Sequence, residues 1–142
     1  MSAAEPLTAK GAATRARLLE VAAALFAEKG YSATSFAELI NASGLTKGAF
    51  YFYFKSKADL ALAVIDDQQE RWVSYVQDRV TAHPTPATQL ADVLPAVLDL
   101  LAREPAAWSM IRLARELGGD PTLGRDVVKP VASWIELLAG II

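Results

Sequence analysis

Two short helical segments separated by a glycine-containing turn limit the fold of this sequence more than any other feature. Ser35 stands three residues before Glu38, which is the spacing of a capping box at the start of a helix. Gly44 breaks that helix, and Thr46 is well placed to cap the next one. Two helices of about two turns joined by a tight turn form a helix-turn-helix. The two predicted helices span residues 36–42 and 46–53.

Apolar residues recur at helical spacing before and after this unit. Leu18, Ala22 and Phe26 lie on one face of a helix predicted over 14–29, which Gly30 can cap. No stretch of useful length alternates as a strand would, so we predict an all-α fold. The later stripes comprise Leu60, Val64, Ile65, Trp72, Tyr75, Val76 and Val80, and then Leu90, Val93, Leu94, Val97, Leu98 and Leu101.

Caps and prolines divide the second part of the chain. Ser56 and Asp59 predict the start of a long helix, and His83-Pro-Thr-Pro86 ends its pattern. Pro95 should kink the following helix, and Pro105 suits the first turn of the next one. That helix carries Trp108, Ile111, Ala114 and Leu117 before Gly118-Gly119, and a last amphipathic segment includes Val131, Trp134, Leu138 and Ile141.

The aromatic run Phe50-Tyr51-Phe52-Tyr53-Phe54 also suits a β-strand. A single strand of five residues would find no partner elsewhere in this chain. In a helix, Phe50 and Phe54 turn toward the apolar faces of the first two helices. Tyr51 and Tyr53 then stay near the open side, so we interpret the run as helical.

Composition excludes several classes of function. With 53% hydrophobic and 21% charged residues the chain can bury a core, and without cysteine it has no disulfide, thiolate metal site or cysteine nucleophile. The sole histidine, His83, lies in a proline-flanked break, and no metal-ligand spacing or glycine-rich phosphate loop accompanies it. We therefore expect no enzyme and no cofactor. The longest apolar run, Val21–Ala27, is far short of the ~20 residues of a membrane span, so we expect a soluble cytoplasmic protein.

The net charge of −2 is unevenly distributed. Residues 1–57 carry seven basic and four acidic side chains, a balance of +3, whereas residues 58–142 carry seven basic and twelve acidic ones, a balance of −5. A basic front on an acidic body suits a small anion-binding module carried by a larger domain, although so small an excess also arises by chance. We therefore predict a helix-turn-helix DNA-binding domain over 1–57 and a helical regulatory domain over 58–142.

The second helix of a helix-turn-helix enters the major groove with its N-terminal residues against the base edges. Here those residues are Thr46, Lys47, Gly48 and Ala49, where free amides and the helix dipole favour a phosphate. Glycine inside a helix costs about 1 kcal/mol relative to alanine, so Gly48 needs a reason. Close approach of the backbone to DNA is one reason, and close packing of two helices is the other.

Further side chains are candidates for contacts that position the DNA backbone. Tyr51 and Tyr53 offer hydroxyl groups that hydrogen-bond to phosphate, which fixes position and reads no base. Ser35 at the first of the two helices, and Lys57 at the start of the long helix, are candidates for the same contact. Taken singly, a lysine such as Lys47 or Lys57 is more often a plain solvated side chain, so the constellation carries the prediction.

The stretch from Thr14 to Leu60 resembles the DNA-binding domain of the TetR (tetracycline-repressor) family. Within that family, "GLTKGAFYFYF" is most similar to the γ-butyrolactone autoregulator receptors of actinobacteria, which usually have His where Tyr53 stands. The resemblance covers about a third of the chain. The matching residues are Phe26, Gly30, Tyr31, Thr34, Gly44, Gly48, Tyr51, Phe54, Ser56, Lys57 and Leu60.

The resemblance implies a repressor that binds a palindromic operator in double-stranded DNA as a homodimer and is released by a small apolar effector such as a γ-butyrolactone. It also implies that Trp134 lies in the effector cavity, with Trp108 and Met110 as further lining. Both tryptophans are equally plausible as ordinary core residues. The resemblance also implies that the region 58–142 is incomplete relative to the family. Trp108, Trp134 and the apolar C-terminus motivate a second hypothesis, a helical small-molecule-binding module with little or no DNA affinity.

Overall fold

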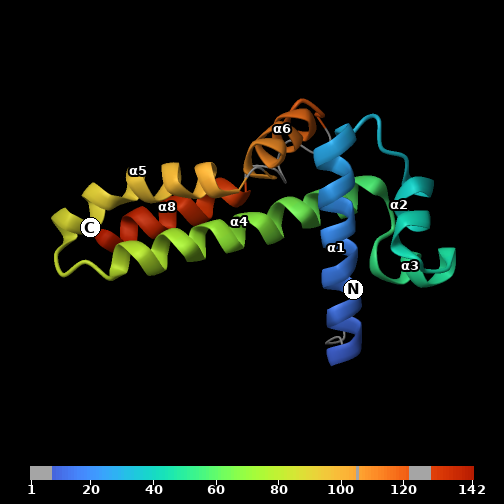
Figure 1. Ribbon diagram of the computed structural model, residues 1–142, viewed down its shortest axis with the longest axis horizontal. Helices are drawn as coiled ribbons and strands as arrows, with labels where there is room; N and C mark the ends of the chain where they lie inside the picture. The colour runs from blue at the N-terminus through green and yellow to red at the C-terminus, as the bar shows by residue number, and fades with distance from the viewer. Residues whose placement is uncertain (1–7, 105, 122–128) are drawn as a thin grey trace.

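The computed structural model describes residues 8–104, 106–121 and 129–142. The described residues form helices joined by turns and contain no strand, which confirms the predicted all-α class. No helix among them is long and apolar enough to cross a membrane. The helices in Figure 1 are α1 (Ala9–Lys29), α2 (Phe36–Ser43), α3 (Lys47–Tyr53), α4 (Lys57–Thr81), α5 (Pro86–Arg103), α6 (Ala106–Gly118) and α8 (Lys129–Ile141).

The hydroxyl caps predicted from the sequence are all present. Ser35 and Glu38 form a reciprocal capping box at the start of α2. The side chains of Thr46 and Ser56 accept from backbone amides in the first turns of α3 and α4. Gly44, between α2 and α3, has a φ of 72° and the left-handed conformation that glycine adopts without strain. Local sequence therefore sets the start of each of these helices.

The first helix begins earlier than its apolar face predicts. It starts at Ala9 rather than near Thr14, because Thr8 accepts a hydrogen bond from the Gly11 amide and caps it there. The added residues are mostly alanine, the strongest helix former, and they are mostly exposed. The helix ends at Lys29 as predicted, with Gly30 at a φ of 84°.

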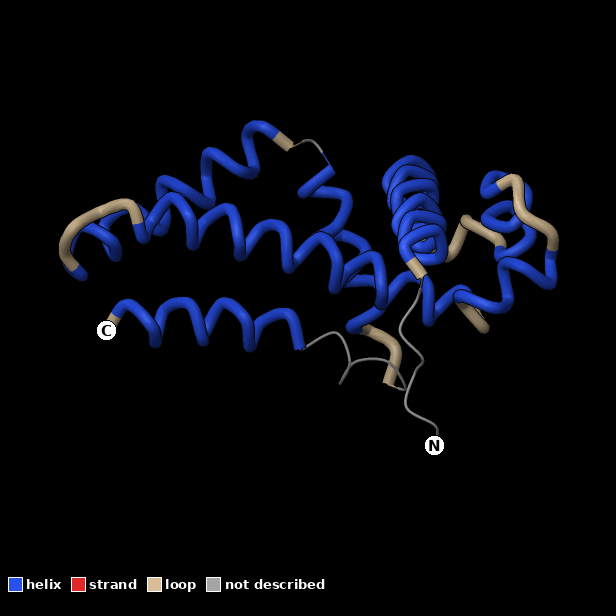
Figure 2. The backbone as a smooth tube through the Cα atoms, turned by 90° about the horizontal axis from the view of Figure 1, so that it is seen from below, coloured by secondary structure: helices blue, strands red, loops and turns tan. Residues whose placement is uncertain are grey.

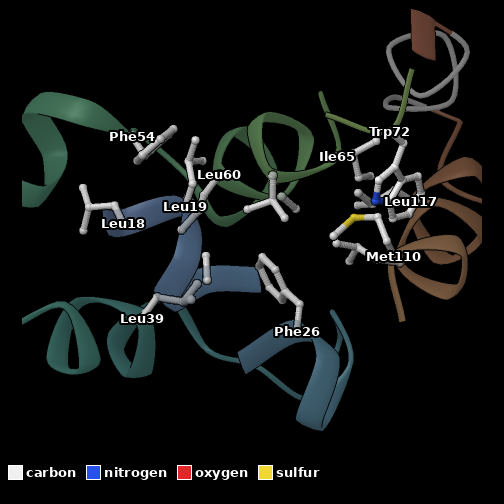
Figure 3. Close-up of a cluster of buried hydrophobic side chains, with 14 of the residues drawn as sticks. Leu18, Leu19, Phe26, Leu39, Phe54, Leu60, Ile65, Trp72, Met110 and Leu117 are labelled. Atoms are coloured by element: carbon white, nitrogen blue, oxygen red, sulfur yellow. The ribbon is translucent and has the colours of Figure 1, made fainter. Parts of the chain in front are cut away.

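The aromatic run is helical, and its two outer phenylalanines are buried as predicted. Phe50 and Phe54 pack with Leu18 and Phe26 of α1 and with Leu39 of α2. Figure 3 shows this cluster continuing from α1 and α2 to α4 and α6. The three N-terminal helices α1, α2 and α3, which we call the head, are thus held on the rest of the chain by one apolar core.

Helix α4 runs through both halves of the molecule (Figures 1 and 2). The head and α6 lie at its N-terminal end, whereas α5 and α8 lie along its C-terminal half. Its predicted inner face is buried apart from the half-buried Tyr75. Leu60, Val64, Ile65 and Trp72 belong to the core shared with the head, and Val76 and Val80 belong to a second core with α5 and α8. The two cores therefore meet along α4.

Pro95 lies inside a helix, whereas the break at 82–85 and Gly118 mark helix ends. Helix α5 continues as one element from Pro86 to Arg103 through Pro95, whose ring is exposed. The break at 82–85 and the end of α6 at Gly118 agree with the sequence pattern. The prediction for Pro105 lies outside the described residues.

A cluster of ion pairs joins α4 to α5. The Arg79 guanidinium donates to both carboxylate oxygens of Asp92 at 2.9 Å and to Asp99 at 3.3 Å. The Tyr75 hydroxyl donates to Asp99 at 2.7 Å, and the His83 ring lies 3.1 Å from Asp92. Arg79 lowers the pKa of the Asp92 carboxyl, and the Tyr75 hydrogen bond lowers that of Asp99.

We predict that these carboxylates make the protein sensitive to acid. A lowered folded-state pKa stabilises the fold above the ordinary carboxyl pKa of 3.8, and this contribution is lost as the pH falls through the lowered value. Urea unfolding at a series of pH values should show the free energy of unfolding falling in that window. In Arg79→Gln the pKa of Asp92 returns toward its ordinary value, so the fall below pH 3.8 should be smaller. The same profile in wild type and variant would contradict this; Arg71→Gln, in an exposed pair with Asp67, is the control.

Candidate DNA-binding surface

Helix α3 presents its first turn to solvent. Thr46, Lys47, Gly48 and Ala49 are all exposed, while Phe50 immediately after them is buried in the core. Figure 1 shows α2 and α3 at the end of the molecule remote from α5 and α8. The positive end of the helix dipole and the amides that the Thr46 cap leaves open therefore face outward, as an anion-binding helix end requires.

Gly48 has open space where its side chain would be. A Cβ built on its backbone meets no other atom within 4 Å. Of the two reasons weighed for this glycine, close packing of helices is therefore not supported by the structure. Close approach of an external molecule remains, and a duplex lying against this turn is such a molecule.

Lys47, Tyr51 and Phe36 form a short stack on the surface of the helix-turn-helix. The Tyr51 ring meets the Phe36 ring edge-on, with centroids 5.4 Å apart, and the Lys47 ammonium lies 5.9 Å from the Tyr51 centroid. Phe36 in turn packs edge-on against buried Phe50 at 5.2 Å. The stack fixes the Tyr51 ring on the protein while the residue stays 40% exposed, so its hydroxyl is free for a phosphate contact.

The remaining predicted contact residues are placed less uniformly. Ser35 is exposed, and its oxygen accepts from Glu38, which leaves its hydroxyl proton for another partner. Tyr53 is half-buried against the core, beside the edge of the Phe52 ring. Lys57 donates to the Tyr31 carbonyl at 3.0 Å and lies over the Tyr31 ring, so one of its three N–H groups is already engaged.

Phe52 is an exposed side chain of α3 that is not among the predicted DNA-contact residues. It is 73% exposed, the most exposed aromatic residue of the helix-turn-helix. Helical phase could have found it, because a residue two positions after buried Phe50 lies on the opposite side of a helix. Its ring extends the exposed surface of α3 beyond Tyr51.

The side chains expected in an effector cavity do not share one face. Met110 is buried, whereas Trp108 is 62% exposed, because α6 packs through Met110, Leu113 and Leu117. Trp108 and Met110 therefore differ in burial, and their role in an effector cavity stays a prediction. Trp134 is half-buried between α8 and α4, and its indole N–H donates to Gln69 at 2.7 Å.

Comparison with known proteins matches this chain to bacterial transcriptional regulators. Residues 18–64 match the family model described as bacterial regulatory proteins of the tetR family. The chain is 49% identical over 47 residues to the HTH-type transcriptional regulator AcrR of Shigella flexneri, covering 33% of this chain and 22% of that protein.

Solved structures match over more of the chain. The regulator FadR from Bacillus subtilis, in complex with stearoyl-CoA, superposes with a TM-score of 0.74 at 21% identity, covering 89% of this chain and 67% of that one. A γ-butyrolactone receptor, an ArpA-like protein, superposes with a TM-score of 0.64 at 27% identity, covering 92% and 63%. The chain spans less than two thirds of the length of the curated relatives it matches.

We predict that Gly48→Ala separates DNA binding from folding. Because the added methyl group meets open space, thermal unfolding should show an unchanged or higher stability, by up to about 1 kcal/mol. DNA affinity, measured by fluorescence anisotropy, should fall about tenfold as base-edge contacts of about 1–3 kcal/mol are displaced. The matched control is Gly140→Ala on α8, which also meets open space and should leave affinity unchanged. Full DNA affinity in Gly48→Ala would show that the duplex does not approach this turn.

Proposed function

We propose, from the match of residues 18–64 to the family model of bacterial regulatory proteins of the tetR family, that the chain is a transcriptional repressor released from its operator by a small apolar effector. Its relatives are named as transcriptional regulators, and this supports a DNA-binding regulator rather than an enzyme. We propose that it acts in the cytoplasm, where bacterial DNA lies.

The exposed first turn of α3 is the observation that carries this proposal. Its amides, Lys47 and open Gly48 face solvent together, and Tyr51 is fixed beside them by Phe36. We assign base-edge contacts to residues 46–49, and phosphate contacts to Ser35, Tyr51, Tyr53 and Lys57. In this assignment buried Phe50 and Phe54 anchor the helix from behind and take no part in reading DNA.

We propose that two copies of the chain bind a palindromic operator, since paired recognition helices reach two half-sites about 34 Å apart. The similarity to the γ-butyrolactone receptor supports an effector of that chemistry, and the stearoyl-CoA complex of the other neighbour supports a ligand with an apolar chain. We assign Met110, Trp134 and Trp108 to the effector-responsive part of the molecule, with Trp108 exposed on α6. The effector acts only through its difference in affinity between the DNA-bound and free states.

Selection from a randomised duplex pool at low salt tests the proposal directly. An inverted repeat with half-sites about one helical turn apart would support a paired regulator. A single half-site would support the DNA-binding domain and contradict the dimer. No enrichment of any sequence would contradict DNA binding and favour a helical module that binds small molecules.

We predict that Lys47→Ala and Tyr51→Phe both weaken binding to the selected DNA. Lys47→Ala should also reduce the slope of log affinity against log salt by about one if the lysine neutralises a phosphate. Tyr51→Phe removes one neutral hydrogen bond, so it should lower affinity with the slope unchanged. Anisotropy titrations at several salt concentrations measure both quantities.

The matched control for charge is Arg71→Ala. Arg71 lies on α4 in an exposed pair with Asp67, and its loss should change neither affinity nor slope. Unchanged binding in both Lys47→Ala and Tyr51→Phe would mean that α3 is not the recognition helix.

A further inference from the structure

A cavity of about 220 Å³ lies between the head and α6. Small alanine side chains of α1 form one wall, and α4 contributes Gln68. Helix α6 forms the other wall with Met110 and Leu113, and adds one hydroxyl group from Ser109. An apolar cavity of about 150 Å³ already holds a benzene molecule, so this one is large enough for a single ring or a short branched chain.

The same helix that lines the cavity also holds the end of α1 through polar contacts. The Arg112 guanidinium donates to the Ala27 carbonyl at 2.9 Å, and the Glu116 carboxylate accepts from the Ser32 amide at 3.4 Å. Glu116 also lies against Gly30, where an added Cβ would come within 3.2 Å of its oxygen. Ala27 therefore belongs both to the cavity wall and to the contact that fixes α6 on the head.

A buried donor without a partner lies in the same region. Trp72 is 5% exposed, and its indole nitrogen finds no hydrogen-bond acceptor among the residues that the structure describes. It stands one turn after Gln68 on α4, and in Figure 3 its nitrogen lies on the side of the ring toward Met110 and Leu117 of α6. Most buried donors are satisfied, so the unpaired Trp72 indole, although it is not part of the cavity wall, shows that the packing between α4 and α6 is incomplete in this region.

We propose that this cavity between α1, α4 and α6 is a regulatory site for a small apolar molecule, about the size of one ring. The regulatory part rests on the proposed function, whereas binding at the cavity does not. A ligand that binds more tightly when α6 lies farther from α1 shifts the population toward that arrangement, in which the contacts of Arg112 and Glu116 with the head are longer. The head then shifts relative to α4, which lowers its affinity for DNA.

The experiment uses the full chain and benzene as the probe. Benzene is titrated against the labelled protein while NMR follows the backbone amides. Shift changes should be largest at residues 23–32 of α1 and its following turn, around Gln68 of α4 and at 109–116 of α6. In a parallel anisotropy titration, saturating benzene should lower affinity for the selected DNA about fivefold or more, the lower end of usual allosteric coupling.

Two variants fill the cavity from opposite walls. Ser109→Leu fills it from α6, and Ala24→Leu fills it from an exposed position on α1 that tolerates a larger side chain. Each should lose both the shift changes and the effect of benzene on DNA affinity. The matched control Ser74→Leu, at an exposed position on α4 outside the cavity, should retain both.

Absence of localised shifts in the wild type, or binding retained in a folded cavity-filled variant, would overturn the site. Localised binding with unchanged DNA affinity would overturn its regulatory role. Failure of the proposed function looks different, because the benzene-free protein would then show no DNA binding while its amide shifts still report the cavity.

Discussion

The row of buried apolar side chains along α4 is the interaction on which the rest of this structure depends. Its N-terminal half packs against the head through Leu60 and Ile65, and its C-terminal half packs against α5 and α8 through Val76 and Val80. Each such side chain contributes about 1.5–3 kcal/mol when fully buried. Because one unbroken helix carries both cores, the orientation of the head is tied to the packing at the far end of α4.

The polar contacts between α6 and the head contribute less to stability than the apolar row does. Arg112 and Glu116 reach backbone groups of α1 and of the turn after it, at exposed positions. A typical net hydrogen bond contributes only about 0.5–1.5 kcal/mol. The apolar row therefore fixes which elements lie together, while the contacts of α6 can be exchanged at small cost. A regulated movement is more easily placed at such a contact than along α4.

Much of the head could be predicted from the sequence, and α6 shows why the rest could not. The caps at Ser35 and Thr46 act within a few residues, so local spacing was sufficient to find them. Helix α6 instead carries two apolar stripes, one through Trp108 and Ile111 and the other through Met110 and Leu113. Periodicity fits both equally, and only contact with α1 and α4 decides that the second stripe is buried. The early start of α1 escaped prediction for a related reason, since alanines mark no face.

Helix α3 has a sequence that forms a helix poorly, and tertiary packing explains why it is helical here. A helix as short as Lys47–Tyr53 is not stable alone in water, and Gly48 weakens it further. Its stability comes from Phe50 and from Phe54 just beyond its end, both buried against α1 and α2. Since those two rings hold the helix from its C-terminal half, the first turn does not need favourable helix formers. That turn can therefore expose its amides and a glycine, which is what close approach to a DNA backbone requires.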